Sequence, residues 1–208
     1  PALLATSALA LGAITAAVPS ASAQRAAGED PLAALLTSDG DQFDNNAKDF
    51  DILTEAALAV VGAKPGSPVA LVADGTKRAT VFAPTDQAFR LLAQDLTGKT
   101  IKSEKKIFEA LVELAGVDTI ETVLLYHVVP GATLTSGKVL KADGAKLKTA
   151  TGQTVKVNVR MKPSLRVTLK DKDRDDRDPR AVLTALDLNK GNKQVAHGID
   201  RVLRPINL

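Results

Sequence analysis

The stretch Thr80–Phe89, "TVFAPTDQAF", combines the end of an apolar run with the signals that start a helix. Its apolar beginning predicts a buried strand. Pro84 has no backbone N–H, so it suits the end of a strand ladder. Thr85 is predicted to be a helix N-cap whose hydroxyl accepts a backbone N–H, and Asp86 places a negative charge near the positive end of the helix dipole. The stretch therefore predicts a buried strand that passes directly into a helix.

The first half of the chain repeats apolar residues at helical spacing. In one of its segments Ile107, Leu111 and Leu114 are predicted to face the core, and Gly116 is predicted to stop the helix. Two apolar runs around Asp74 and Gly75 instead predict a hairpin. The predicted helices cover 49–63, 85–97, 103–116 and 119–125.

The second half changes to a period of two, which is typical of strands with one solvated face. A Thr-Gly turn separates two of these strands. The predicted strands lie within 145–159, 165–170, 181–188 and 195–208. Helices early and strands late predict an α+β protein.

Three stretches resemble the signature segments of the fasciclin (FAS1) domain family. They are Thr80–Phe89, Leu124–Gly131 ("LLYHVVPG") and His197–Pro205 ("HGIDRVLRP"), called here the first, second and third signature segments. The resemblance covers roughly 31–208 and implies a FAS1-type fold, with helices of the N-terminal half packed on a mostly antiparallel β-sandwich or wedge. The residues that it marks as structural are Thr80, Phe82, Pro84, Thr85, Asp86, Phe89, Tyr126, His127, Pro130, Gly131, His197, Ile199, Asp200, Val202, Leu203 and Pro205.

Tyr126 and His127 are adjacent, which raises the question of whether they belong to an active site. A His-dependent hydrolase needs an activated nucleophile and an orienting acid, and the chain has no Gly-x-Ser-x-Gly motif. We expect a structural pair whose polar ends find partners in Asp86 or in backbone groups of the other signature segments. A metal site formed by His127 and His197 lacks supporting close ligands. We therefore predict no catalytic, cofactor-binding or metal-ligating residues.

The acidic run "DKDRDDRDP", 171–179, is expected to form a solvated hairpin loop. Calcium binding is an alternative, although the EF-hand pattern requires Gly at position 6 and Glu at position 12. Those positions hold Asp176 and Val182. The loops 171–180 and 62–66 are the two candidate interaction surfaces. The carboxylates of the candidate interaction loop belong to Asp171, Asp173, Asp175, Asp176 and Asp178.

The apolar segment 1–23 ends in Ala-x-Ala and is predicted to be a signal peptide cleaved after Ala23, although no basic n-region precedes it. Its length and polar interruptions disfavour a permanent membrane anchor. We expect 24–30 to be a flexible mature N-terminus and 31–208 a single FAS1 domain. The sequence contains no cysteine, which excludes thiol catalysis and Cys-based metal sites. Its scarce aromatics and dispersed basic residues argue against nucleic-acid binding.

The resemblance implies a secreted, non-enzymatic module for cell adhesion or matrix contact, similar to stand-alone bacterial members of the family. Its expected partner is an extracellular or cell-surface protein or a matrix component, and no cofactor is expected. The alternative is a carrier of a small apolar ligand such as a carotenoid or lipid. Some relatives bind integrins through Asp-Ile before the last segment, but 189–194 contains no such pair. Asp51–Ile52 is read as a helix start.

Overall fold

The computed structural model describes residues 26–38, 43–44 and 46–206. The predicted signal peptide, 1–23, lies outside these residues, and the boundaries of the 24–30 and 31–208 segments stay predictions. Among the described residues, no helix combines the length and apolar character needed to cross a membrane. The α-helices are α1 (Leu32–Leu36), α2 (Asp51–Ala63), α3 (Asp86–Thr97), α4 (Glu104–Tyr126) and α5 (Ser136–Leu140).

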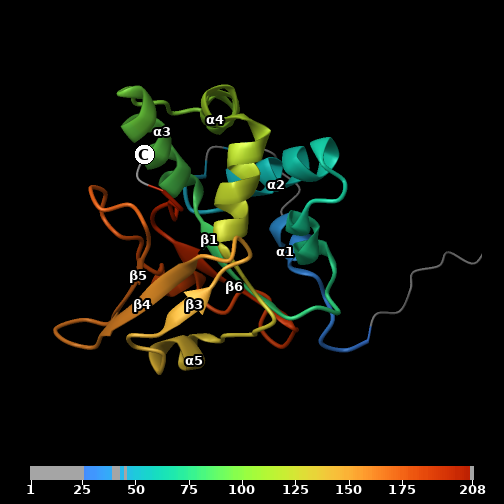
Figure 1. Ribbon diagram of the computed structural model, residues 1–208, viewed down its shortest axis with the longest axis vertical. Helices are drawn as coiled ribbons and strands as arrows, with labels where there is room; N and C mark the ends of the chain where they lie inside the picture. Colours follow the sequence, from blue (N-terminus) through green and yellow to red (C-terminus); the bar gives the residue numbers. More distant parts are fainter. Residues whose placement is uncertain (1–25, 39–42, 45, 207–208) are drawn as a thin grey trace, which may run out of the picture.

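Two three-stranded sheets complete the fold. In the first, β1 pairs in parallel with β6 and antiparallel with β2, and in the second β4 lies between β3 and β5 with both pairings antiparallel. Figure 1 shows α1 to α4 on one side of the molecule and the β3–β4–β5 sheet with α5 on the other. The predicted α+β class is confirmed. The strands are β1 (Ala79–Pro84), β2 (Val128–Pro130), β3 (Lys146–Lys148), β4 (Thr154–Arg160), β5 (Arg166–Lys170) and β6 (Gln194–Ile199).

Strand β1 lies between two apolar cores, which explains why every one of its residues is buried. Side chains alternate across a strand, so Val81 and Ala83 join the core formed with the helices. Phe82 points the other way, into the core formed with the second sheet, beside Val157 and Leu169. The first signature segment therefore links the helical and sheet halves.

Several predicted elements have the expected bounds. A strand leads into α3, whose N-cap is Thr85, and Asp51 begins α2. Ser103 caps α4 by accepting from the Lys106 N–H, and the backbone of Gly116 leaves the helical region at φ 71°. The left-handed φ suits glycine, so the predicted helix stop appears as a kink inside α4.

Other predictions are wrong. The apolar run before Asp74 forms the 3₁₀ helix η1 (Pro68–Ala73), so the predicted hairpin does not form. Within 181–188 the chain forms the short 3₁₀ helix η2 (Leu183–Ala185) with isolated bridges from Ala181 and Leu188 to β6. Apolar content alone does not distinguish such short 3₁₀ turns from strands. Leu114, predicted to face the core, is 57% exposed.

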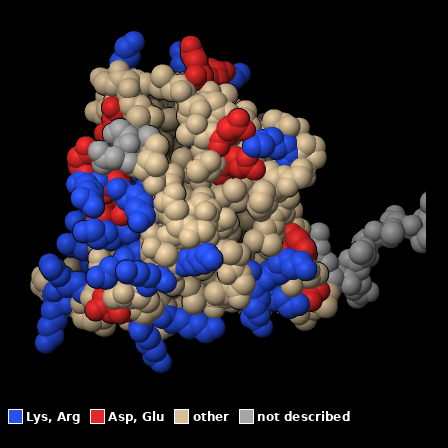
Figure 2. All heavy atoms as spheres, in the orientation of Figure 1, with Lys and Arg blue, Asp and Glu red and all other residues tan. Residues whose placement is uncertain are grey.

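Charged side chains are unevenly distributed over the surface. Figure 2 shows lysines and arginines gathered over the part of this face where Figure 1 places β3, β4 and β5. The helical side in the same view shows mainly uncharged residues with mixed acidic and basic groups. The net charge is only +3, so the basic character belongs to a region and not to the chain as a whole.

Candidate functional site

His127 ends α4 and has both ring nitrogens engaged by backbone groups. Its Nδ1 lies 2.7 Å from the Val123 carbonyl oxygen, and its Nε2 lies 2.8 Å from the Leu203 nitrogen. A carbonyl only accepts, so Nδ1 carries the proton and Nε2 accepts the Leu203 N–H. The residue is 1% exposed, and burial lowers the pKa of His127 to about 4. The neutral imidazole thereby joins the second signature segment to the third.

His197, on β6, is held in the opposite tautomer. Its Nε2 donates to the Leu134 carbonyl over 2.7 Å, and its Nδ1 accepts the Asp187 N–H over 3.2 Å. Burial lowers the pKa of His197. Ser136 lies nearby, but its hydroxyl donates to the Asp187 carboxylate over 2.7 Å and not to the imidazole. A nucleophile–base pair requires the serine to bond the imidazole, so these three residues do not form a catalytic triad.

The phenol of Tyr126 also bonds to backbone. Its hydroxyl donates to the Thr154 carbonyl over 3.2 Å, and burial raises the pKa of Tyr126. Asp86 does not hydrogen-bond Tyr126 or His127. Of their backbone partners only Leu203 belongs to another signature segment, since Thr154 and Val123 lie outside all three. Thr80 behaves similarly, since its hydroxyl donates to the Ala132 carbonyl and accepts the Leu134 N–H, both over 2.8 Å.

The marked residues lie mostly in the interior. Pro130 and Gly131 are exposed at a turn, where Gly131 has φ 78° and donates its N–H to the Arg78 carbonyl. Asp200 is half-buried and pairs with Arg177 over 2.8 Å. The buried positions are Thr80, Phe82, Pro84, Thr85, Asp86, Phe89, Tyr126, His127, His197, Ile199, Val202, Leu203 and Pro205.

The carboxyl group of Asp86 caps α2 and not its own helix. It accepts the N–H groups of Ile52 over 2.9 Å and Asp51 over 3.2 Å. Helix α2 has no side-chain cap from its own N-cap residue, Phe50, so Asp86 satisfies N–H groups that would otherwise lack a partner. Burial, with a hydrogen bond to Asp49, raises the pKa of Asp86 to about 9. The expectation of a charged Asp86 at neutral pH is therefore wrong.

Thr85 also differs from expectation. It occupies the N-cap position of α3, but its hydroxyl makes no capping bond. The Thr85 carbonyl instead accepts the N–H groups of Ala88 and Phe89. Its position was predictable from the local sequence, while its side-chain contact was not.

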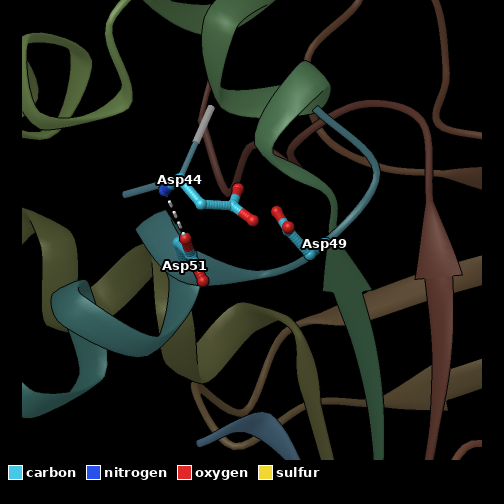
Figure 3. A group of neighbouring side chains, drawn as sticks. All are labelled: Asp44, Asp49 and Asp51. Carbon is cyan, nitrogen blue, oxygen red and sulfur yellow. Dashed lines mark hydrogen bonds between the residues drawn. The ribbon is translucent and has the colours of Figure 1, made fainter. Parts of the chain in front are cut away.

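An acidic cluster surrounds this cap. Figure 3 shows the carboxylates of Asp44, Asp49 and Asp51 grouped beside the first turn of α2, with Asp51 accepting the Asp44 N–H over 3.2 Å. Their oxygens lie within 4.8 Å of one another, as do those of Asp49, Asp86 and Glu104. Oxygen sets of this kind can hold Ca²⁺ or Mg²⁺. Backbone N–H groups and the hydrogen bond between Asp49 and Asp86 already give these carboxyl groups partners, so we interpret the cluster as the α2 cap.

The acidic run is folded onto the third signature segment. Buried Arg204 bonds Asp173 over 3.1 Å and approaches Asp176 to 3.3 Å. Asp171 accepts the Arg204 N–H over 2.8 Å, and Arg201 pairs with Asp176 over 2.9 Å. Burial raises the pKa of Asp171 to about 6. The expectation of a solvated run is wrong for Asp173, which is 4% exposed.

These contacts change which carboxylates remain for a ligand. Asp171, Asp173 and Asp176 already bond arginines or backbone, and calcium needs 6–8 oxygen ligands. Asp175 is exposed but has a hydrogen bond with Asp173, and Asp178 is half-buried. A role of the loop in interaction stays a prediction. The long-range pairing with Arg204 has no signal in the local pattern.

Gln194 was missed by the sequence analysis, although it is 0% exposed. Its side-chain oxygen accepts the Leu32 N–H over 2.8 Å. Its amide nitrogen donates to the carbonyls of Leu71 over 2.8 Å and Asp74 over 2.9 Å. One side chain of β6 thus connects α1 with both the end of η1 and the following turn. The only local signal is a glutamine at the start of an apolar strand.

Two small apolar cavities lie among the described residues of the helical half. One, of about 80 Å³, lies among α2, α3 and α4 and is lined by Phe89, Leu92 and Phe108. The other, of about 130 Å³, lies among α1, α2 and η1 and is lined by Leu36 and Val61. Drug-sized ligands occupy pockets of about 300–1,000 Å³. Neither cavity has room for a carotenoid or a lipid chain.

Comparisons with known proteins agree on the fold. The model of the family described as the fasciclin domain matches residues 67–205. A solved FAS1 domain pair from the insect cell adhesion molecule fasciclin I superposes with a TM-score of 0.51 at 14% identity, over 78% of this chain and 51% of that one. This chain therefore spans about half of that solved chain, and the likeness concerns the fold. No curated protein matches the sequence.

Proposed function

Since the chain belongs to the fasciclin domain family, which is linked to cell adhesion and is generally non-catalytic, we propose that it is a secreted adhesion module without enzymatic activity. Its partner in this proposal is an extracellular or cell-surface component. Export depends on the predicted signal peptide at 1–23. The proposal places recognition on the exterior of the domain, where loops and sheet faces are accessible.

One observation carries the non-enzymatic part. Both histidines have each ring nitrogen bonded to a backbone group in the interior. A general base must reach the proton that it abstracts and must exchange it during turnover. His127, with a pKa of about 4 and 1% exposure, cannot meet that requirement without breaking the contact between the signature segments. The signature residues therefore support the fold and leave the surface for binding.

The carrier function is the weaker candidate because of the cavity sizes. Volumes of about 80 and 130 Å³ fall below the range of ligand pockets. To hold such a ligand in either of these cavities, the protein would have to enlarge the helical core, which contains Ile52, Phe89 and Leu111 at 7% exposure or less. Organic extraction of the native protein tests this directly. A stoichiometric pigment or lipid in the extract would favour the carrier over the adhesion module.

Adhesion is tested with fluorescent beads that carry the purified full chain. We expect the beads to be retained on the cells that produce the protein and to release when free chain is added as competitor. Chemical crosslinking on the same cells then identifies the bound component. Beads carrying an unrelated protein of equal net charge are the control. Equal retention of both bead types, or turnover that disappears in His127→Ala without loss of fold, would contradict the proposal.

A further inference from the structure

The second sheet has an outer face formed by cations. The strands β3, β4 and β5 contain six lysines and arginines and no aspartate or glutamate. The alternate residues Val155, Val157, Val167 and Leu169 are buried in the core. Period-two alternation therefore directs the charged set outward. This set, called here the basic face, is Lys146, Lys148, Lys156, Arg160, Arg166 and Lys170.

The register places like charges directly opposite one another. Lys156 pairs with Lys146 on one side and with Lys170 on the other, which forms a row of three ammonium groups. Arg160 pairs with Arg166 at the other end of the same strands. Like charges in directly opposed cross-strand positions destabilise a sheet. The strand pairing therefore concentrates positive charge where the fold itself gains nothing from it.

The protein does not neutralise this charge internally. Across 26–38, 43–44 and 46–206, no member of the basic face has a carboxylate within 4.0 Å. By contrast, Arg201 and Arg204 on the neighbouring segment are paired with aspartates. The same chain thus pairs its inner arginines and leaves the basic face open to an external anion.

An arginine-lined hollow of about 400 Å³ lies at the end of this face. Arg160 and Arg166 contribute from the sheet, and Arg177 and Arg180 contribute from the loop that follows. Burial and the neighbouring guanidinium groups of Arg166 and Arg177 lower the pKa of Arg180. The volume of the hollow lies within the range of small-ligand sites. The hollow is therefore a candidate binding site for one anionic group, beside the longer row of lysines.

The hollow also contains groups that recognise hydroxyls. Asn158 both donates and accepts, Thr168 carries a hydroxyl, and the carboxylate of Asp178 accepts. Guanidinium groups bind carboxylate and phosphate in a bidentate geometry. The combination fits a ligand that presents anionic groups and hydroxyls together. No aromatic residue lines the hollow, so it has no stacking surface for nucleobases.

The spacing of the cations favours an extended ligand. Neighbouring strands lie about 4.8 Å apart, so the lysine row spans roughly 10 Å. Arg160 follows Lys156 by four positions along β4, which corresponds to about 13 Å at the rise of a strand. A single small anion contacts one corner of such a surface. Several linked anionic groups contact all of it.

We propose that the basic face binds an anionic polysaccharide, with one charged sugar seated in the arginine hollow and the chain running along the lysine row. This inference rests on the proposed adhesion function and specifies the chemistry of its partner. The charge on the sugar is carboxylate, sulfate or phosphate, which share the same recognition by guanidinium and ammonium groups.

The test measures affinity of the full chain for immobilised heparin, polygalacturonate and a phosphorylated mannan, with neutral dextran and duplex DNA as comparisons. The face variant is Lys146→Gln/Lys156→Gln/Lys170→Gln. The control variant removes three exposed lysines near the start of α4, Lys102→Gln/Lys105→Gln/Lys106→Gln, so that both variants have the same net charge. Thermal melting checks that both keep the fold.

We expect binding to at least one anionic polysaccharide and not to dextran, and the polymer that binds identifies the anionic group. A lysine beside an anionic membrane surface contributes about a fivefold effect on affinity, and we take a similar magnitude for an anionic polymer. The face variant should therefore lose at least tenfold in affinity, while the control changes by about twofold or less. Affinity should fall as salt rises, because surface charges are screened. In Arg160→Gln/Arg166→Gln, preference for the best polysaccharide over the other two should shrink.

Three results would overturn the inference: no binding to any of the polysaccharides, equal loss in the face and control variants, or DNA binding as tight as the best polysaccharide. The bead assay separates this failure from failure of the proposed function. If the face variant loses no cell retention and the wild-type beads still adhere, adhesion stands and the polysaccharide is rejected. If wild-type beads do not adhere but binding to an anionic polysaccharide depends on the basic face, the polysaccharide site stands and adhesion to the producing cells is rejected.

Discussion

The polar groups of the interior are hydrogen-bonded, whereas the cations of the basic face lie opposite residues of the same charge. His127 and Gln194 are almost fully buried, and their side-chain nitrogens and oxygens bond the backbone of distant segments. Lys156 and Arg166 lie on an outer sheet face opposite residues of the same charge. The first group is arranged for stability, and the second is arranged at some cost to stability.

This difference separates structural from recognition residues without reference to any partner. A buried polar group left without a hydrogen-bond partner costs free energy, so its substitution should destabilise the protein. A like-charged surface residue loses repulsion when it is neutralised, so its substitution should be neutral or slightly stabilising. Substitutions of buried polar residues and of basic-face residues should therefore differ in their effect on stability.

Gln194→Leu should produce the largest loss. The substitution leaves the Leu32 N–H without its partner, and it removes one of two hydrogen bonds from the carbonyls of Leu71 and Asp74. At about 1–3 kcal/mol for the unsatisfied N–H and about 0.5–1.5 kcal/mol for each of the two lost hydrogen bonds, the free energy of unfolding should fall by about 2–6 kcal/mol. Urea unfolding measures the change. Gln87→Leu, on the exposed surface of α3, is the matched control and should change stability by about 0.5 kcal/mol or less.

Asp86→Asn should alter the pH dependence of stability. The pKa of Asp86 is raised to about 9 in the folded state, so the folded protein binds more protons than the unfolded chain between about pH 4 and 9. Its contribution is complete below pH 4 and is lost as the pH rises toward 9. The asparagine resembles the protonated acid and does not titrate. The free energy of unfolding of the wild type should therefore fall by roughly 2–4 kcal/mol relative to that of the variant between pH 5 and 8.

Urea titrations of both proteins at several pH values measure that difference. Asp118→Asn is a suitable control, because Asp118 is exposed on α4. Parallel pH profiles for wild type and Asp86→Asn would show that Asp86 is ionised in the folded protein. The α2 cap would then be a carboxylate, and the acidic cluster would require a different account.

His127→Ala should lower the free energy of unfolding by about 1–3 kcal/mol, because the Leu203 N–H and the Val123 carbonyl lose their partners. The pKa of His127 is lowered to about 4 in the fold, so the unfolded chain binds more protons below about pH 6.5. Wild type should thus lose stability from pH 6.5 to 4. In the variant this acid dependence should weaken. An unchanged melting temperature would remove His127 from the structural group.

Local sequence predicted what local interactions determine. The strand-to-helix passage at Thr80–Phe89 and the break at Gly116 follow from residues that act on their own neighbours. The protonated Asp86 could not be predicted, because its partners belong to a helix that begins 35 residues earlier. The aspartates bound to Arg204 were misjudged for the same reason. The basic face was not predicted either, because its lysines and arginines are dispersed along the sequence and are brought together only by the strand register.

Arg166→Gln should give the smallest effect on stability and thereby define the other side of the comparison. Arg166 faces Arg160 across the sheet and helps to lower the pKa of Arg180. Its removal relieves repulsion and leaves the buried Val167 in place. The free energy of unfolding should stay within about 0.5 kcal/mol of wild type or rise slightly. Added salt screens the same repulsion. The stability of the wild type should therefore rise relative to that of the variant as ionic strength increases. A clear loss of stability at low salt would place Arg166 among the structural residues and would remove it from the recognition surface.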